Sequence, residues 1–311
     1  MNFINNKLIL NSPAKVNLHL EVLGRRKDGF HELAMVMQNI DLSDSLEMEF
    51  NNMEELNLSS NSSQLPLDRN NLIIKTAETL RKSFPKRNLG VNIFLKKNIP
   101  IGAGLAGGSS NAAATLIGLN KLWELNLNKK TLHQIASELG SDVPFFLEGG
   151  SQYCFGRGEI LEKYKFNSKY TLILLKNPNV SVSTSEVYKK YSEKYSDKYL
   201  NTEIEFEEKR NSLRSVGFDN SNIFNNGIKI KNDLQKIVQK ENKSVRDALE
   251  LFSNIKDCLC FSMSGSGPSC YAIFNNYENA ERVYEKNKEL FLKFGFNSWL
   301  CNFKSKGITI I

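Results

Sequence analysis

A glycine-rich segment at residues 100–114 constrains this chain more than any other feature. It reads P-I-G-A-G-L-A-G-G-S-S-N-A-A-A. The glycines remove side chains, so the backbone can approach an anion closely and adopt unusual φ values at little cost. A helix is predicted from about Ser109 to Glu124, and its first turn offers free N–H groups and the positive end of the dipole. The predicted phosphate-binding residues are Pro100, Ile101, Gly102, Ala103, Gly104, Leu105, Ala106, Gly107, Gly108, Ser109 and Ser110.

Two better-known glycine-rich motifs fit this segment poorly. Three of its glycines spell G-x-G-x-x-G, the dinucleotide fingerprint, which starts at a strand end and needs an acidic residue about 20 positions later. Here Pro100 interrupts the approach, and residues 126–128 are Asn, Leu and Asn. A Walker A loop needs Gly-Lys-Ser/Thr, but Gly108 is followed by two serines. A nicotinamide-dependent oxidoreductase and a P-loop enzyme are therefore both disfavoured. A plain glycine-rich turn without a ligand is also disfavoured, because several glycines and serines stand directly before an alanine-rich helix.

The charge of the chain is compatible with a phosphate-bearing partner. Lys and Arg exceed Asp and Glu by 41 to 34, a formal net charge of +7. Nucleotides and nucleic acids would both be attracted by such a surface. An RNA-binding protein would concentrate its basic residues and interleave them with exposed aromatics, whereas here they are spread along the chain. No nucleic-acid partner is predicted.

The cysteines and the apolar residues indicate a cytoplasmic protein. There are five cysteines and no C-x-x-C pair, which argues against a disulfide framework and a structural zinc site. No stretch is long and apolar enough to span a membrane, and residues 1–10 lack an apolar signal core. We therefore expect reduced thiols, no membrane partner and a cytoplasmic location.

The apolar pattern predicts an α+β chain, with a composition shift near residues 165–170. Strands are predicted at residues 7–10, 16–22, 31–40, 45–50, 91–95, 170–175 and 270–274. Besides the helix after the loop, helices are predicted at residues 72–84, 130–139, 184–199, 244–252 and 278–291.

Two polar stretches give weaker signals. Residues 51–70 are rich in Asn, Ser and Glu and are predicted to be loop or sheet edge, and residues 200–232 look the least ordered. In the preceding predicted helix, Tyr191, Tyr195 and Tyr199 lie four apart. This spacing is interpreted as one face of a surface helix rather than an aromatic binding stripe.

Four short sequence blocks follow one another in a fixed order along the chain. The blocks are S-P-A-K-V-N-L at 12–18 with G-R-R-K-D-G-F-H-E at 24–32, P-x-G-x-G-L-x-G-G-S-S-N-A-A in the glycine-rich segment, G-S-D-V-P-F at 140–145, and M-S-G-S-G-P-S at 263–269. Together they resemble the GHMP small-molecule kinases, which include galactose, homoserine, mevalonate and phosphomevalonate kinases. The resemblance covers nearly the whole chain and is poorest at residues 195–230. The G-G-S-S-N-A form is most similar to the branch that acts on a cytidine-diphosphate-linked sugar alcohol.

The resemblance implies a fold and an activity. The expected architecture is the two-domain GHMP arrangement. Residues 1–167 would form a first domain like domain 2 of ribosomal protein S5, residues 168–311 a ferredoxin-like second domain, and the active site would lie in the cleft between them. The expected reaction is phosphorylation of the 2-hydroxyl of the cytidyl sugar alcohol, in non-mevalonate isoprenoid precursor synthesis. ATP would be the phosphoryl donor, accompanied by Mg²⁺. The enzyme would be a monomer or homodimer.

The same resemblance assigns a catalytic pair, Lys15 and Asp142. Taken alone, Asp142 before Val-Pro is typical of a turn or cap, and Lys15 of a surface strand. Phosphoryl transfer needs a carboxylate near the attacking hydroxyl and a cation near the transferred group, which these two would supply. Asn17 shares a strand face with Lys15 and would either hold the lysine or contact the substrate.

An aromatic-histidine step, Phe30-His31, matches the part of the family that stacks on cytosine and binds its edge. Family members commonly have Tyr at the position of Phe30, so stacking is retained here without a phenol hydroxyl. Tyr188 matches the second aromatic that would sandwich the base, and Thr184 is a further substrate contact. A GHMP kinase for another alcohol, such as homoserine or mevalonate, would share the loop but has no need of this step.

A second glycine-rich turn is expected to support the phosphate loop. Gly265, Ser266 and Gly267 form it, and their small size would let the second domain approach the loop closely. Lys96 and Lys97 precede the loop and could reach the nucleotide, although they are interpreted as solvated charges. The sequence identifies no metal ligands.

Overall fold

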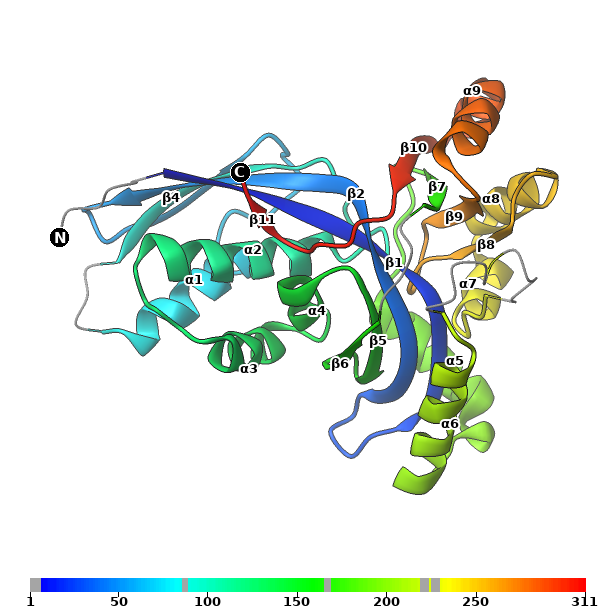
Figure 1. Cartoon of the computed structure of the whole chain (residues 1–311), viewed down its shortest axis with the longest axis horizontal. Helices are drawn as coiled ribbons and strands as arrows, with labels where there is room; N and C mark the ends of the chain where they lie inside the picture. Colours follow the sequence, from blue (N-terminus) through cyan, green and yellow to red (C-terminus); the bar gives the residue numbers. More distant parts are fainter. Residues whose placement is uncertain (1–6, 86–88, 165–168, 219–223, 225–229) are drawn as a thin grey trace.

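Two β-sheets organise the molecule (Figure 1). This computed structural model describes residues 7–85, 89–164, 169–218, 224 and 230–311. Within those residues, a seven-stranded sheet comes mainly from the first half of the chain and a four-stranded sheet from the second half. Helices cover one face of the first sheet, and a further group of helices from the second half of the chain lies beside the second sheet (Figure 1). The predicted α+β organisation is confirmed.

A long hairpin runs through the first sheet. Strand β1 (Lys7–Arg25) pairs antiparallel with β2 (His31–Asn51). The sequence predicted two shorter strands in place of each, separated by breaks. The register instead shifts between Pro13 and Lys15, which accommodates a proline that has no N–H for the ladder. Strand β1 therefore continues through the first predicted break and carries Lys15 and Asn17 into the middle of the molecule.

Strand β2 is central in this sheet because it also pairs with β4 (Gly90–Lys96) and β5 (Ser151–Gly156). Strand β6 (Ile160–Lys163) pairs with β5. Strand β3 (Leu56–Ser60) runs parallel to β4 at one edge, in agreement with the loop-or-edge prediction. At the other edge, the short β11 (Thr309–Ile310) pairs with β1. The end of the chain thus returns to the first sheet, as the red segment of Figure 1 shows.

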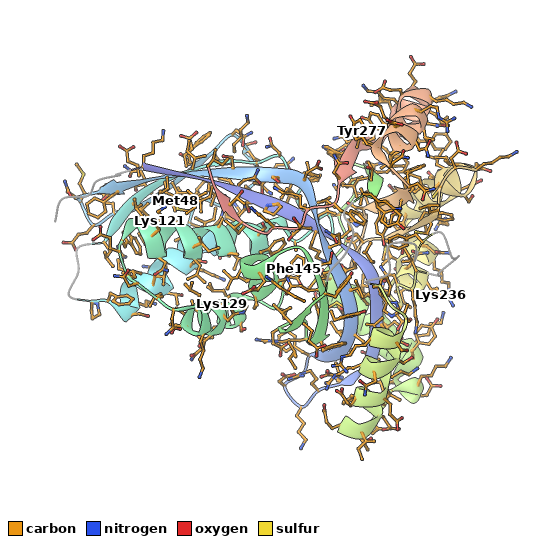
Figure 2. All side chains as sticks on the ribbon, in the orientation of Figure 1. Met48, Lys121, Lys129, Phe145, Lys236 and Tyr277 are labelled. Atoms are coloured by element: carbon orange, nitrogen blue, oxygen red, sulfur yellow. The ribbon has the colours of Figure 1, made fainter. Side chains whose placement is uncertain are left out.

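The covering layer of this sheet consists of α1 (Leu72–Ser83), α2 (Gly107–Leu122), α3 (Lys129–Leu139) and α4 (Val143–Glu148). Helix α2 packs closely on the strands, since a Cβ on Gly118 would lie 2.6 Å from Sδ of Met48. Met48 on β2 and Phe145 on α4, both labelled in Figure 2, are fully buried. This packing fixes the start of α2, where the phosphate loop ends, relative to β1.

The second sheet contains β7 (Thr171–Lys176), β8 (Cys260–Met263), β9 (Cys270–Phe274) and β10 (Asn297–Asn302), in the spatial order β10-β7-β9-β8. All its pairs are antiparallel. With helices between the first and second strands and between the third and fourth, this is the predicted ferredoxin-like arrangement. The helices after β7 are α5 (Thr184–Tyr195), the short 3-10 helix η1 (Ser196–Lys198), α6 (Glu203–Ser215), α7 (Gln235–Glu241) and α8 (Lys243–Ser253), and α9 (Tyr277–Lys293) follows β9.

The polar stretch 200–232 is more ordered than predicted, because it contains α6. The Thr202 hydroxyl accepts from the backbone amide of Glu205, and the Glu205 carboxylate accepts from the backbone amide of Thr202, which forms a capping box. Arg210 of α6 is buried and pairs with Glu32 of β2 at 2.7 Å. Ion pairs attach the helix together with only two apolar side chains, Phe206 and Leu213, which explains why the apolar pattern did not indicate it. Residues 219–223 and 225–229 of the stretch lie outside the described residues.

The tyrosine repeat also differs from its interpretation as a surface face. Helix α5 ends at Tyr195, and η1 turns the chain so that Tyr199 stacks on Tyr191 at 6.4 Å between ring centroids. Tyr191 is 9% exposed, and the Tyr199 hydroxyl contacts His31. The face therefore packs inward, against the end of the β1–β2 hairpin.

The predicted domain boundary between residues 167 and 168 falls outside the described residues. Just before it β6 belongs to the first sheet, and just after it β7 belongs to the second. The final residues cross back, because the Lys304 amide donates to the Asn39 carbonyl and Phe303 forms a bridge with Ile40. The second predicted domain therefore contributes an edge strand to the first sheet.

Glu148, at the end of α4, is expected to make the fold sensitive to acid. Burial raises its pKa, but hydrogen bonds from Lys129, Lys163 and His133 outweigh this and lower it from 4.5 to about 2. A lowered carboxyl pKa stabilises the fold above pH 4.5, and this contribution is lost as the pH falls toward 2. Because both lysines are largely exposed, we expect Glu148→Gln to cost about 1–2 kcal/mol at pH 7.

Urea unfolding at pH 7, 4.5 and 3 measures this effect, with Glu138→Gln on the exposed side of α3 as the control. The Glu148→Gln variant should be less stable than the parent at pH 7 and should approach it at pH 3. A constant difference between the two proteins across this range would contradict the assignment.

Candidate functional site

A cavity of about 1180 Å³ lies between the phosphate loop, strand β1, the end of the hairpin and helix α5. It brings together segments that are far apart in the sequence. Every residue from Pro100 to Ser109 lines it. The other predicted site residues in its wall are Lys15, Asn17, Phe30, His31, Asp142, Thr184, Tyr188, Gly265 and Ser266.

The phosphate loop ends in a helix whose first turn has no side-chain cap. Helix α2 begins at Gly107, two residues before the predicted Ser109, and Ala106 at its N-cap has a left-handed φ of 52°. Among the described residues, no side chain caps this turn, and Gly107, Gly108 and Ser109 line the cavity. Free N–H groups and the helix dipole are therefore available to an anion, as the sequence predicted.

Ser110 is the exception among the predicted loop residues. Its side chain is fully buried, and its hydroxyl donates to the carbonyl of Pro13 and accepts from the hydroxyl of Ser12, each at 2.7 Å. It fastens α2 to β1 and does not face the cavity. Ser109 is the serine of this turn that lines the cavity.

The second glycine-rich turn lies against the phosphate loop. The Ser264 hydroxyl donates to the Gly104 carbonyl at 3.0 Å, and Ser266 contacts Thr184 at 2.8 Å between hydroxyls. Gly104 has a φ of 72°, and a Cβ there would lie 2.3 Å from the Ser264 carbonyl oxygen. Gly265 lies beside Gly104 and lines the cavity, whereas Gly267 contacts Gly104 but does not line the cavity.

The predicted catalytic pair forms in the middle of the cavity. Lys15 Nζ lies 3.7 Å from Oδ2 of Asp142 and donates to Oδ1 of Asn17 at 2.5 Å. The Lys15 side chain is 6% exposed, and that of Asp142 is 30% exposed. Lys15 is thus a buried cation with two oxygen partners, and Asp142 remains open to the cavity.

Asn17 is held on three sides, which makes it a firm support for Lys15. Its backbone carbonyl accepts from the Tyr271 hydroxyl at 2.7 Å, and its backbone amide donates to the Ser264 hydroxyl at 3.3 Å. Its side-chain Nδ2 contacts Sδ of Met35 at 3.5 Å. Of the two roles left open by the sequence, the geometry favours holding the lysine.

Asp142 occupies the N-cap position of α4, but its side chain makes no capping hydrogen bond. A cap residue would turn its carboxylate to the first amides of the helix. Here the carboxylate faces Lys15 instead. The turn therefore positions the Asp142 carboxylate for a purpose other than capping the start of α4.

The aromatic end of the cavity differs in detail from the predicted sandwich. His31 stacks directly on Tyr188, with ring centroids 4.9 Å apart and planes 25° apart. Phe30 is 49% exposed, and the Arg157 guanidinium covers its ring at 5.0 Å. Burial and the nearby Arg25 lower the pKa of His31, which favours a neutral ring. A flat base would therefore meet Phe30 on one side and a histidine edge on another.

Several supporting residues were missed from the sequence. Asn232 donates to the carbonyls of Met263 at 2.7 Å and Gly265 at 2.9 Å, so it fixes the second turn. It lies in the stretch predicted to be the least ordered, where no signal marked it. Arg157 comes from the β5–β6 turn and was likewise unmarked.

Asp44 supports the start of the phosphate loop, and it was also missed from the sequence. Its carboxylate is buried and accepts from the amides of Asn98 at 2.7 Å and Ile99 at 2.8 Å, and from Asn111 Nδ2 at 2.9 Å. It also pairs with Lys97, whose side chain is 7% exposed, so Lys97 is not the solvated charge predicted. One acid thus joins β2, the entry to the loop and helix α2.

Asp44→Asn is expected to raise KM for ATP about tenfold, equivalent to about 1.4 kcal/mol, with a smaller change in KM for the acceptor. The amide removes the charge opposite Lys97 and places a donor against backbone donors, so the loop loses its support. ATP titrations at saturating acceptor measure the effect, and thermal unfolding records the accompanying loss of stability. Asp257→Asn, in an exposed pair with Arg282, is the control. An unchanged KM for ATP would contradict this role.

Comparisons with known proteins match the site and the fold. Residues 71–150 match the GHMP kinases N terminal domain, and residues 218–293 match the GHMP kinases C terminal domain. A 4-diphosphocytidyl-2-C-methyl-D-erythritol kinase of Prochlorococcus marinus subsp. pastoris (strain CCMP1986) is 56% identical over 306 residues, which is 98% of each chain. A protein of the same name from P. marinus strain MIT 9312 is 58% identical over 307 residues, again 98% of each.

The chain belongs to the 4-diphosphocytidyl-2-C-methyl-D-erythritol kinase family, within the GHMP kinases. It is an ATP-dependent small-molecule kinase, as predicted, and the oxidoreductase and RNA-binding alternatives are set aside.

Solved structures agree with this family. A crystal structure of a 4-(cytidine 5'-diphospho)-2C-methyl-D-erythritol kinase has a TM-score of 0.69 at 26% identity, covering 95% of this chain and 98% of the other. The mevalonate kinase of L. major has a TM-score of 0.72 at 12% identity, covering 97% and 98%, and supports the fold alone. Within the described ranges, no helix of this kinase is long and apolar enough to cross a membrane.

Proposed function

We propose that this kinase transfers the γ-phosphoryl group of ATP to the 2-hydroxyl of 4-diphosphocytidyl-2-C-methyl-D-erythritol, a step of non-mevalonate isoprenoid precursor biosynthesis. The names of relatives more than 50% identical over almost the full chain support it. The observation that carries it is the Lys15–Asp142 pair, which stands in one cavity between a phosphate-binding loop and an aromatic-histidine wall.

In this mechanism the acceptor hydroxyl binds at Asp142. The carboxylate accepts or orients its proton, so that the oxygen attacks the γ-phosphorus. Lys15 lies close enough to stabilise the negative charge that develops on the transferred group, and its low exposure strengthens that effect. Asn17 keeps the ammonium aimed at this point.

The triphosphate would follow residues 100–109, with its terminal oxygens at the first turn of α2. Mg²⁺, when bound with ATP, neutralises phosphate charge. Such an ion keeps waters and phosphate oxygens as most of its ligands, so it needs few protein groups. This fits the described residues, where no cluster of three or more His, Cys, Asp or Glu stands ready to hold a metal. Ser109 offers a hydroxyl and Asp142 a carboxylate on this side of the cavity.

The cytidine would lie at the opposite end, against Phe30, His31 and Tyr188. Thr184 lines the same wall and is fixed by Ser266. Every group in this account comes from one chain, so the site would be complete in a monomer or in each half of a homodimer. We expect a cytoplasmic enzyme, and its five cysteines are free thiols.

ADP release tests this proposal, measured with the cytidyl sugar alcohol beside homoserine, mevalonate and galactose. Turnover restricted to the cytidyl substrate is expected, since only that substrate uses the aromatic end. Turnover with another of these alcohols instead would retain the ATP site and overturn the assigned acceptor. No turnover with any of them would overturn the proposed reaction.

A further inference from the structure

His31 is surrounded by hydroxyl groups that together determine where its ring proton lies. Nε2 lies 2.8 Å from the Ser192 hydroxyl oxygen and 3.1 Å from the Tyr199 hydroxyl oxygen. Those two hydroxyls are 2.9 Å apart. Ser192 is also 3.0 Å from the carbonyl oxygen of Tyr188, one helical turn earlier in α5.

The Ser192 hydroxyl has one proton and two lone pairs to share among three neighbours. The Tyr188 carbonyl only accepts, so it takes the Ser192 proton. The two lone pairs then accept, one from the Tyr199 hydroxyl and one from Nε2 of His31. All three contacts are satisfied only if His31 Nε2 carries a hydrogen.

The other ring nitrogen of His31 is then an acceptor. A neutral imidazole carries one N–H, and burial together with Arg25 lowers the pKa of this ring. Within the described part of the chain, Nδ1 forms no hydrogen bond and is not fully buried. His31 lines the large cavity at its aromatic end. Its free lone pair is thus accessible to a bound molecule.

We propose that Ser192 and Tyr199 are positioning residues that hold His31 in the Nε2–H tautomer, so that Nδ1 accepts a hydrogen bond from the exocyclic amino group of cytosine. This rests on the proposed function, in which a cytidyl group occupies this end of the cavity. Cytosine carries an amino group where uracil carries a carbonyl oxygen. The carbonyl oxygen of a uracil would place a lone pair against the lone pair of Nδ1. The relay, meaning the hydrogen bonds that join Tyr199, Ser192 and His31, therefore selects cytosine over uracil.

The tautomer is read directly by ¹⁵N NMR of the enzyme labelled at histidine. The chain has three histidines, His19, His31 and His133, and His31→Gln identifies the relevant signals. We expect a protonated Nε2 and an unprotonated Nδ1 in the wild-type enzyme at pH 7. The opposite pattern would overturn the proposal, whether or not the enzyme turns over any substrate.

Base selectivity is read from kcat/KM for the cytidyl substrate relative to its uridine diphosphate analogue. Ser192→Ala and Tyr199→Phe are each expected to reduce this ratio about tenfold, the effect of losing about 1.4 kcal/mol of hydrogen bonding. The change should appear in KM for the cytidyl substrate, with KM for ATP unaltered. Ser192→Thr retains the hydroxyl and should restore the ratio, and Ser212→Ala on the exposed face of α6 is the control.

A ratio unchanged in both Ser192→Ala and Tyr199→Phe would overturn the relay, as would a loss in Ser192→Ala that Ser192→Thr fails to restore. Failure of the proposed function looks different. In that case the wild-type enzyme would not turn over the cytidyl substrate at all, and the selectivity proposed here would be overturned with it.

Discussion

Asp142→Asn is expected to lower kcat about a thousandfold, within the range typical for loss of a positioned acid–base group. The amide has nearly the same size as the carboxylate but cannot accept the hydroxyl proton. Because Asp142 makes no capping hydrogen bond to α4, the fold should remain stable and KM for ATP should change little. Steady-state kinetics at saturating ATP, with thermal unfolding alongside, measure the effect.

Lys15→Met is the partner experiment. It removes the cation 3.7 Å from Asp142 and should also lower kcat by a large factor. If the two groups act as a unit, the double variant should lose far less than the product of the two single losses. Glu138→Gln on α3 serves as the control carboxylate change. Near-native kcat in Asp142→Asn would show that the carboxylate has been assigned the wrong role.

Gly104→Ala is expected to raise KM for ATP and lower kcat, with kcat/KM falling at least about a hundredfold, or about 2.7 kcal/mol. The new Cβ would lie 2.3 Å from the Ser264 carbonyl oxygen and 2.9 Å from that of Gly267. Both are backbone atoms and cannot move aside without separating the two glycine-rich turns. A φ of 72° adds strain for any residue with a side chain.

Gly295→Ala separates these two causes. Gly295 has a similar φ of 80°, but a Cβ there would meet only Nδ2 of Asn177, at 3.4 Å. This variant should lose about 1 kcal/mol of stability through backbone strain and retain normal kinetics. Equal effects of both substitutions on kcat/KM would contradict the view that contact between the turns shapes the nucleotide site.

The parts of this site that could be predicted are those with strong local rules. A glycine-rich loop before an alanine-rich helix has a physical reason to bind phosphate wherever it occurs. The strands and helices followed from apolar periodicity. The pairing of Lys15 with Asp142 followed only from resemblance, because no local rule joins positions 127 residues apart.

The parts that could not be predicted depend on tertiary contact. Asp44 is one of many acids in a strand, and nothing in its neighbourhood shows that it will accept hydrogen bonds from the loop. Asn232 and helix α6 lie in a polar stretch where ion pairs and side-chain amides form the attachments beside a few apolar contacts, such as that of Leu213. Tyr199 reaches His31 only because η1 turns the chain after Tyr195.

A crystal structure with Mg²⁺, a non-hydrolysable ATP analogue and 4-diphosphocytidyl-2-C-methyl-D-erythritol tests the central claim most directly. The account predicts the triphosphate along residues 100–109 and the cytosine beside Phe30 and His31. It also predicts the 2-hydroxyl within hydrogen-bond reach of the Asp142 carboxylate, about 2.6–3.2 Å. A 2-hydroxyl that points away from Asp142 and Lys15, or a base bound outside the aromatic end, would contradict it.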